Sequence, residues 1–119
     1  MVGILVDTCG WVALSNSGIN IDIEMEKIVG KADLKITINV KRELESLNSK
    51  SLMLDILFHK AEVIGNKTVQ HTDTELVTLS KQFLWPVLTI DKKLKSDLIK
   101  NGCSYIEVTA SKSLRLIGN

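Results

Sequence analysis

The sequence has few of the features that mark secreted, membrane or zinc-binding proteins. Its two cysteines, Cys9 and Cys103, are too few and too far apart for a disulfide framework or a zinc site. No apolar run approaches the roughly 18 residues that a membrane helix needs, and the chain enters a strand without a charged leader segment. We therefore expect a protein of the reducing cytoplasm with no membrane partner.

Aromatic residues are also scarce, at 4%, so a hydrophobic core must be built from aliphatic side chains. The 119 residues are 45% hydrophobic, which is enough for one domain over residues 1–119. Neither sign of charge dominates, and the net charge of +1 predicts no overall attraction to nucleic acid. There are fifteen Lys and Arg, however, and four of the fourteen acidic residues gather in the pattern described below, which leaves a modestly basic exterior.

Strand and helix patterns alternate along the whole chain. Apolar runs bounded by turn residues predict strands at residues 2–6, 34–38, 61–64, 87–90, 105–108 and 114–117. Helical spacing and end signals predict helices at about 7–16, 21–29, 39–47, 52–58, 72–84 and 91–100, with Asn39 as the cap of the third. This alternation favours an α/β fold, a three-layer α/β/α sandwich with a mostly parallel central sheet.

Four acidic residues lie where strands end or helices begin. Asp7 follows the first predicted strand and Asp91 the fourth, while Glu43 and Asp73 lie in the first turns of predicted helices. Open parallel sheets bind ligands outside the carboxyl ends of their strands. Carboxylates gathered there supply the oxygen ligands that Mg²⁺ or Mn²⁺ prefers. The pattern therefore predicts a metal-dependent enzyme that acts on phosphate esters.

Two of these acids also have a purely structural interpretation. Asp7 and Asp91 are well suited to cap the helices that follow them. Glu43 is harder to explain in this way. It shares a helical stripe with Val40 and Leu47, so we expect it to point inward. An ionised carboxylate in that direction is costly unless it is paired or bound to metal.

The fifth predicted helix contains two acids with different interpretations. Asp73 lies three residues before Leu76, on the inward stripe of the helix. Glu75 follows Thr72 by three residues and is expected to form a capping box with it. Four acids at matching positions, with Glu75 set aside, favour one shared site.

The sequence around the four acids resembles that of the PIN-domain ribonuclease superfamily. Four segments carry the resemblance along nearly the whole chain, in the family's order and spacing: Ile4-Leu5-Val6-Asp7-Thr8, Val40-Lys41-Arg42-Glu43-Leu44, Thr72-Asp73 with Leu76 and Leu79, and Leu88-Thr89-Ile90-Asp91-Lys92-Lys93-Leu94-Lys95. Within the superfamily the chain is more similar to small archaeal Fcf-like proteins than to VapC-type toxins. The resemblance implies a PIN-like fold.

The resemblance also implies a function. Such a protein is an endoribonuclease that uses Mg²⁺ or Mn²⁺ and an activated water to cleave RNA, in ribosomal RNA processing or as a toxin-like enzyme. Its catalytic and metal-binding residues would be Asp7, Glu43, Asp73 and Asp91. The basic residues beside the acids would contact the RNA backbone or, alternatively, form solvated helix faces: Lys41, Arg42, Lys92, Lys93 and Lys95. Further partners implied are a second copy of the chain, an antitoxin or a ribosome-assembly factor.

The chain departs from the family pattern at two positions. Family members usually have Asn or Ser where this chain has Cys9, and a thiol is a poor partner for a hard cation, so we expect a hydrogen bond to the site to be missing. Fcf-like proteins usually have a second Asp where this chain has Thr74. Both changes predict a weakened metal site.

Two other classes of protein compete with this interpretation. Phosphatases and receiver modules that form an acyl-phosphate also place an Asp after the first strand, but the first class needs a second Asp at the position of Cys9 and receivers need an acid pair and a late lysine that are missing here. A catalytically attenuated PIN fold, acting as an RNA-binding or protein scaffold subunit, is the alternative that Thr74 leaves open.

Overall fold

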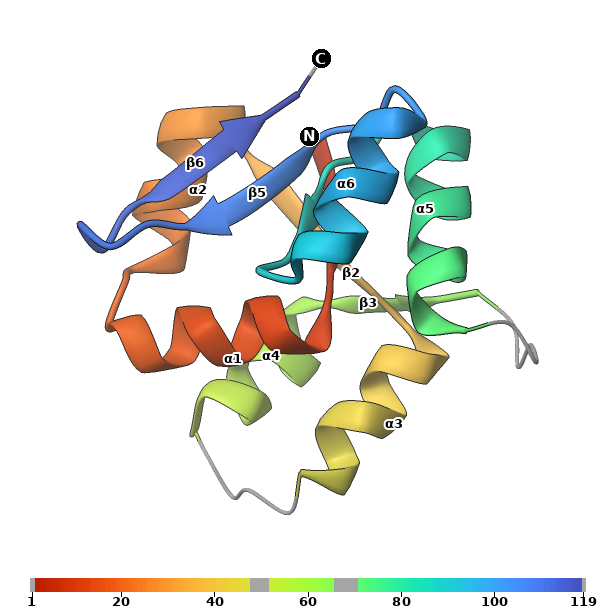
Figure 1. Ribbon diagram of the computed structural model, residues 1–119. Helices are drawn as coiled ribbons and strands as arrows, with labels where there is room; N and C mark the ends of the chain where they lie inside the picture. The colour runs from red at the N-terminus through yellow and green to blue at the C-terminus, as the bar shows by residue number, and fades with distance from the viewer. Residues whose placement is uncertain (1, 48–51, 66–70, 119) are drawn as a thin grey trace.

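The strands form one six-stranded sheet in the computed structural model, which describes residues 2–47, 52–65 and 71–118 (Figure 1). The strands are β1 (Val2–Val6), β2 (Ala32–Thr37), β3 (Glu62–Ile64), β4 (Val87–Leu88), β5 (Tyr105–Val108) and β6 (Leu114–Ile117). They lie in the order β3-β2-β1-β4-β5-β6. Strand β6 is antiparallel to β5, and the other neighbouring pairs are parallel.

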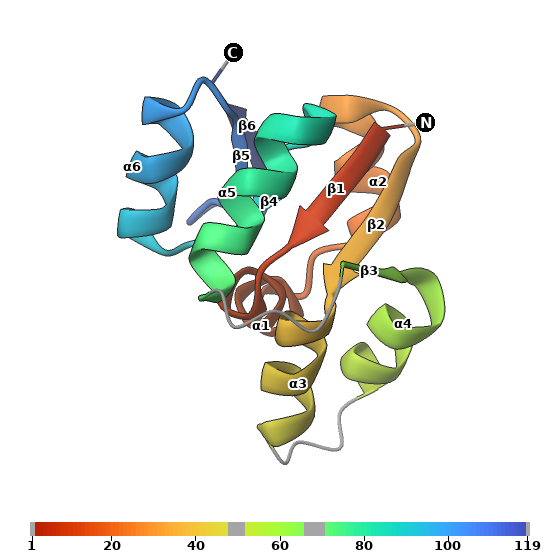
Figure 2. The ribbon, with the colours of Figure 1, turned by 90° about the vertical axis from the view of Figure 1, so that its right-hand side faces the viewer.

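Helices cover both faces of this sheet. Helices α1 (Thr8–Ser17) and α2 (Ile21–Val29) lie on one face, and α5 (Thr72–Phe83) and α6 (Lys92–Lys100) lie on the other (Figures 1 and 2). Helix α3 (Ile38–Ser46) extends beyond the carboxyl end of β2, and α4 (Leu52–Lys60) leads into β3. The predicted three-layer α/β/α sandwich with a mostly parallel sheet is confirmed. Within the described ranges, no helix combines the length and hydrophobicity of a membrane-spanning segment.

The predicted elements are all present, with shifted ends in the middle of the chain. The second strand begins at Ala32 and ends at Thr37, so residue 38 already belongs to α3. The prediction that Asn39 caps this helix is wrong. Thr37 caps it instead, because its hydroxyl accepts a hydrogen bond from the Val40 amide at 3.1 Å. The fourth strand is shorter than predicted and stops at Leu88.

The order of the strands brings distant segments of the chain to one edge of the sheet. The chain builds β2 and β3 on one side of β1 and then crosses to build β4 and β5 on the other. The loops that follow β1 and β4 therefore lead in opposite directions. The gap between two such loops, at the carboxyl ends of the strands, is the usual place for a ligand site in such sheets. The residues after β1 and β4 are those that contain Asp7 and Asp91.

A glycine lets α1 pack directly on the backbone of β4 at this edge. A methyl group on Gly10 would lie only 2.3 Å from the carbonyl oxygen of Leu88, a distance that no real contact allows. The next turn of α1 buries Trp11 and Leu14 completely in the aliphatic core. Trp11 is therefore a core residue, and the close approach at Gly10 fixes the start of α1 against Thr89.

Candidate active site

Asp7 is held firmly at the start of α1. One carboxylate oxygen, Oδ1, accepts a hydrogen bond from the Thr8 amide at 2.9 Å, so Asp7 is the N-cap of α1. The other, Oδ2, accepts from the Thr89 hydroxyl at 2.8 Å and from the Cys9 thiol at 3.1 Å. The residue is only 6% exposed. A carboxylate with three donors has a fixed position, which a metal ligand or catalytic acid requires.

Thr89 links Asp7 to the second capping acid, Asp91. The Thr89 side chain is fully buried, and its hydroxyl accepts a hydrogen bond from the Asp91 amide at 3.1 Å while it donates to Asp7. Asp91 in turn caps α6, because its Oδ1 accepts from the amides of Lys93 and Leu94 at 2.8 and 3.2 Å. The capping interpretation is thus correct for both acids, and both residues contact the hydroxyl of Thr89. Sequence reasoning assigned no role to Thr89.

Glu43 does not point inward, which corrects the interpretation of its helical stripe. Helix α3 buries Val40 and Leu44, whereas Glu43 is exposed and Leu47, beyond the last turn, is 48% exposed. The Glu43 carboxylate instead reaches toward the start of α1, where its Oε1 accepts a hydrogen bond from the Thr8 hydroxyl at 2.9 Å. Glu43 is therefore directed to the residue next to Asp7 by a hydrogen bond and not by burial.

Burial and the negative charges of the other three acids both affect the pKa of Asp73. Burial raises the pKa of its carboxyl above the ordinary value, and the negative charges of Asp7, Asp91 and Glu43 raise this pKa further. The positive charge of Lys93 acts in the opposite direction. The other three acids therefore lie near enough for their charges to act on Asp73, and a cation bound close to Asp73 would relieve that repulsion. Thr74, the neighbouring position that departs from the family pattern, is exposed.

The donor set fits a hard, hydrated divalent cation. All four predicted ligands are carboxylates, which suit Mg²⁺ or Mn²⁺. Among the described residues, no three His, Cys, Asp or Glu side chains come close enough to enclose an ion by themselves. Mg²⁺ is usually held by one or two carboxylates and several waters, so it does not need such a cage. The residues therefore fit an ion whose remaining ligands are water or phosphate.

Cys9 keeps the hydrogen bond that the sequence predicted to be missing. Its thiol donates to Asp7 and lies 3.5 Å from the Thr89 hydroxyl. Burial raises the pKa of this thiol, and the nearby Asp7 charge raises it further despite the opposing hydrogen bond from Thr89. The thiol therefore stays protonated at neutral pH and acts as a donor to Asp7.

Glu75 also differs from its expected role. The N-cap of α5 is His71, which makes no side-chain capping hydrogen bond, so Thr72 and Glu75 form no capping box. The Glu75 side chain is instead buried, at 5% exposure, and its Oε1 accepts a hydrogen bond from the side-chain Nδ2 of Asn39 at 3.4 Å. A buried acid two residues from Asp73 was not apparent from the helical pattern.

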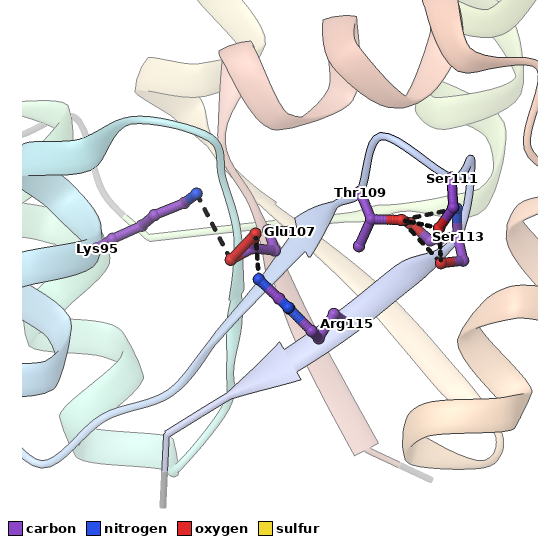
Figure 3. A network of polar contacts seen from close by, with 6 residues as sticks. All are labelled: Lys95, Glu107, Thr109, Ser111, Ser113 and Arg115. Atoms are coloured by element: carbon purple, nitrogen blue, oxygen red, sulfur yellow. Dashed lines mark hydrogen bonds and ion pairs between the residues drawn. The ribbon is translucent and has the colours of Figure 1, made fainter.

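The basic residues beside the acids differ in their availability. Lys92 and Lys93 in the first turn of α6 are exposed, as is Arg42 on α3, and Lys41 is half-buried. Lys95 is engaged on the protein surface: its ammonium lies 3.7 Å from Glu107, which also pairs with Arg115 at 3.2 Å (Figure 3). The ammonium also lies 5.3 Å from the centre of the Tyr105 ring. Lys95 is therefore less available than Lys92 and Lys93 to contact an RNA backbone.

Comparison with solved structures identifies the fold. The chain is similar to the PIN domain endonuclease Utp24, with a TM-score of 0.83 and 22% sequence identity over 98% of this chain and 92% of that one. No protein-family profile matches the sequence, and no curated protein sequence matches it. At this level of identity the similarity shows the fold alone. The chain has a PIN-like fold, as the resemblance implied, while its relation to Fcf-like proteins or VapC-type toxins stays a prediction.

Proposed function

We propose that this protein is a metal-dependent endoribonuclease, with Asp7, Glu43, Asp73 and Asp91 as its metal-binding and catalytic residues. One observation carries the proposal: hydrogen bonds through two threonines connect three of these acids. Thr89 links Asp7 to the loop of Asp91, and Thr8 links Glu43 to the start of α1. The similarity to a PIN domain endonuclease supports the same assignment.

The protein's own residues would orient the cation and the water. Asp7 presents a fixed carboxylate because Thr89 and Cys9 hold it in place, and Asp91 is fixed by the first turn of α6. When bound, Mg²⁺ or Mn²⁺ lowers the pKa of a water and stabilises negative charge on the phosphate. Asp73 would be a further carboxylate to hold the ion or a water beside it, and a bound cation would lower the pKa that the neighbouring acids raise.

The site uses no side-chain nucleophile in this account. Cys9 is the only nucleophilic thiol beside the acids among the described residues, and its raised pKa keeps it in the unreactive, protonated form. We propose a protein of one domain, residues 1–119, that acts in the cytoplasm on RNA. Ribosomal RNA processing and a toxin-like role are both compatible with this site.

The second candidate is an attenuated PIN fold that binds RNA or protein without cutting. It is favoured by Thr74, where a carboxylate would have added to the site, and by the absence of a tight three-ligand cluster among the described residues. In this case Asp7 and Asp91 serve as helix caps and the basic surface holds the RNA.

Metal-dependent cleavage separates the two candidates. We expect the purified protein to cut single-stranded RNA internally with Mn²⁺ or Mg²⁺ present and to stop when EDTA removes the ion. Products are resolved on denaturing gels with end-labelled RNAs of varied sequence. Filter retention measures binding of the RNA. If the RNA is bound but stays intact at every Mn²⁺ concentration, the attenuated scaffold is the correct candidate.

Lysines 92 and 93 are expected to bind the RNA backbone beside the cut. Replacing both by alanine should weaken RNA binding and lower its salt dependence by a slope of about 0.7 for each phosphate that is no longer neutralised. The measurement is the RNA dissociation constant across a salt series. Lys100→Ala, which removes an exposed charge from the last turn of the same helix, is the matched control and should leave the slope unchanged. Equal slopes in both variants would contradict the assignment.

A further inference from the structure

The carboxylate of Glu75 is buried where three segments of the chain meet. It lies in the first turn of α5 and accepts a hydrogen bond from Asn39 in the first turn of α3. Gly65, just after β3, lies against it, since a methyl group there would be 3.4 Å from Glu75 Oε2. Burial of an ionised carboxylate is costly unless donors and dipoles compensate. The Asn39 amide and the amino end of α5 supply that compensation.

Both partners of this hydrogen bond lie next to proposed metal ligands. Asn39 precedes Glu43 by four residues on α3, so the two lie one turn apart on the same face. Glu75 follows Asp73 by two residues on α5. The start of α3 and the start of α5 lie side by side in Figure 1. The Asn39–Glu75 hydrogen bond therefore joins the helix of one ligand to the helix of another.

We propose that Asn39 and Glu75 are positioning residues, whose hydrogen bond sets the distance between Glu43 and Asp73 around the cation. The inference rests on the proposed function. Glu43 is exposed, and among the described residues its carboxylate is hydrogen-bonded to Thr8. The Asn39–Glu75 hydrogen bond ties the start of α3 to the start of α5, so it bears on where the Glu43 carboxylate lies relative to Asp73. Mg²⁺ accepts ligands only in a narrow range of about 2.0–2.1 Å. Loss of a partner that orients a ligand costs roughly 10–100-fold in metal affinity.

The hydrogen bond and the charge of Glu75 can be separated by substitution. Asn39→Ala removes the donor and keeps the charge, and we expect it to weaken Mn²⁺ binding about tenfold or more. Glu75→Gln removes the charge and keeps an acceptor for Asn39, and we expect affinity within about threefold of wild type. The exchange Asn39→Asp with Glu75→Gln reverses donor and acceptor at constant net charge and should also retain affinity. If Glu75 acted only by its negative charge, the order of the first two variants would be reversed.

The measurement is the Mn²⁺ dissociation constant by calorimetry, without RNA, with the thermal midpoint recorded for each variant. Asn16→Ala, on the exposed side of α1, is the control for an Asn-to-Ala change and should bind as wild type does. A merely structural pair would lower the midpoint of Asn39→Ala and leave its Mn²⁺ affinity unchanged, which overturns the proposal. Should Asn39→Ala not fold, a tenfold loss of affinity in the exchanged pair overturns it as well. Wild type that binds no Mn²⁺ overturns the proposed function itself, and this inference with it.

Discussion

Asp7→Asn is expected to reduce RNA cleavage by about a hundredfold or more while the protein stays folded. The substitution removes one of the negative charges that act on Asp73, and the proposed cation would supply several kcal/mol of charge stabilisation in the transition state. Asn has nearly the same shape and can still accept a hydrogen bond from the Thr8 amide, as the N-cap does now. Its amide nitrogen stands where Oδ2 now accepts hydrogen bonds from Thr89 and Cys9, so we expect a moderate loss of stability without unfolding.

The measurement is the single-turnover cleavage rate at saturating Mn²⁺, together with the circular dichroism spectrum. Asp55→Asn, on the exposed face of α4, removes the same charge away from the four acids and should cut at the wild-type rate. A rate for Asp7→Asn within about threefold of wild type would remove Asp7 from the catalytic group.

Gly10→Ala is expected to destabilise the protein by about 3 kcal/mol or more, which is a large part of the stability of a domain of this size. The added methyl group would lie 2.3 Å from the Leu88 carbonyl oxygen and 2.7 Å from its carbon. Both atoms belong to the backbone of β4, in the middle of the sheet, so they cannot move aside as a flexible side chain would. Helix α1 must tilt away, and the hydrogen bond from Thr89 to Asp7 opens with it.

Chemical denaturation of Gly10→Ala against wild type measures this effect. Gly18→Ala is the matched control in the same helix: Gly18 ends α1 with a φ of 74° and has no atom within 4 Å of an added methyl group. Its cost comes only from the left-handed backbone, at about 1–2 kcal/mol. If the two variants lose the same stability, the close packing of α1 on β4 is not a determinant of the fold.

Local rules were sufficient for most of the fold. The strands at residues 105–108 and 114–117 and the helix ending at Gly30 follow from apolar runs and glycine stops, which depend on neighbouring residues alone. Asp7 and Asp91 were identified both as caps and as site residues, because a residue that caps a helix after a parallel strand lies at the ligand edge of the sheet. In this way local sequence placed two of the four acids.

The remaining features of the site depend on contacts between distant segments. Thr89 donates to a residue 82 positions away, so only the adjacency of β1 and β4 shows its role, although a hydroxyl two residues before Asp91 was a usable signal. The prediction that Glu43 points inward is wrong because it relied on an apolar helical stripe that included Leu47, where α3 has already ended. Glu75 was assigned to a cap because the pattern Thr-x-x-Glu was present. Tertiary contact with Asn39 overrides that pattern.

Titration with Mn²⁺ tests the central claim most directly, because it needs neither the right RNA nor an intact cutting step. Calorimetry of wild type should show saturable binding of Mn²⁺ and a thermal midpoint that rises with the ion, since a ligand that binds only the folded state stabilises it. Asp7→Asn should lose at least about tenfold in affinity, because a carboxylate that three donors hold in place is removed. Binding of equal strength in the two proteins, or no rise in the wild-type midpoint with Mn²⁺, would contradict a metal site formed by Asp7, Glu43, Asp73 and Asp91.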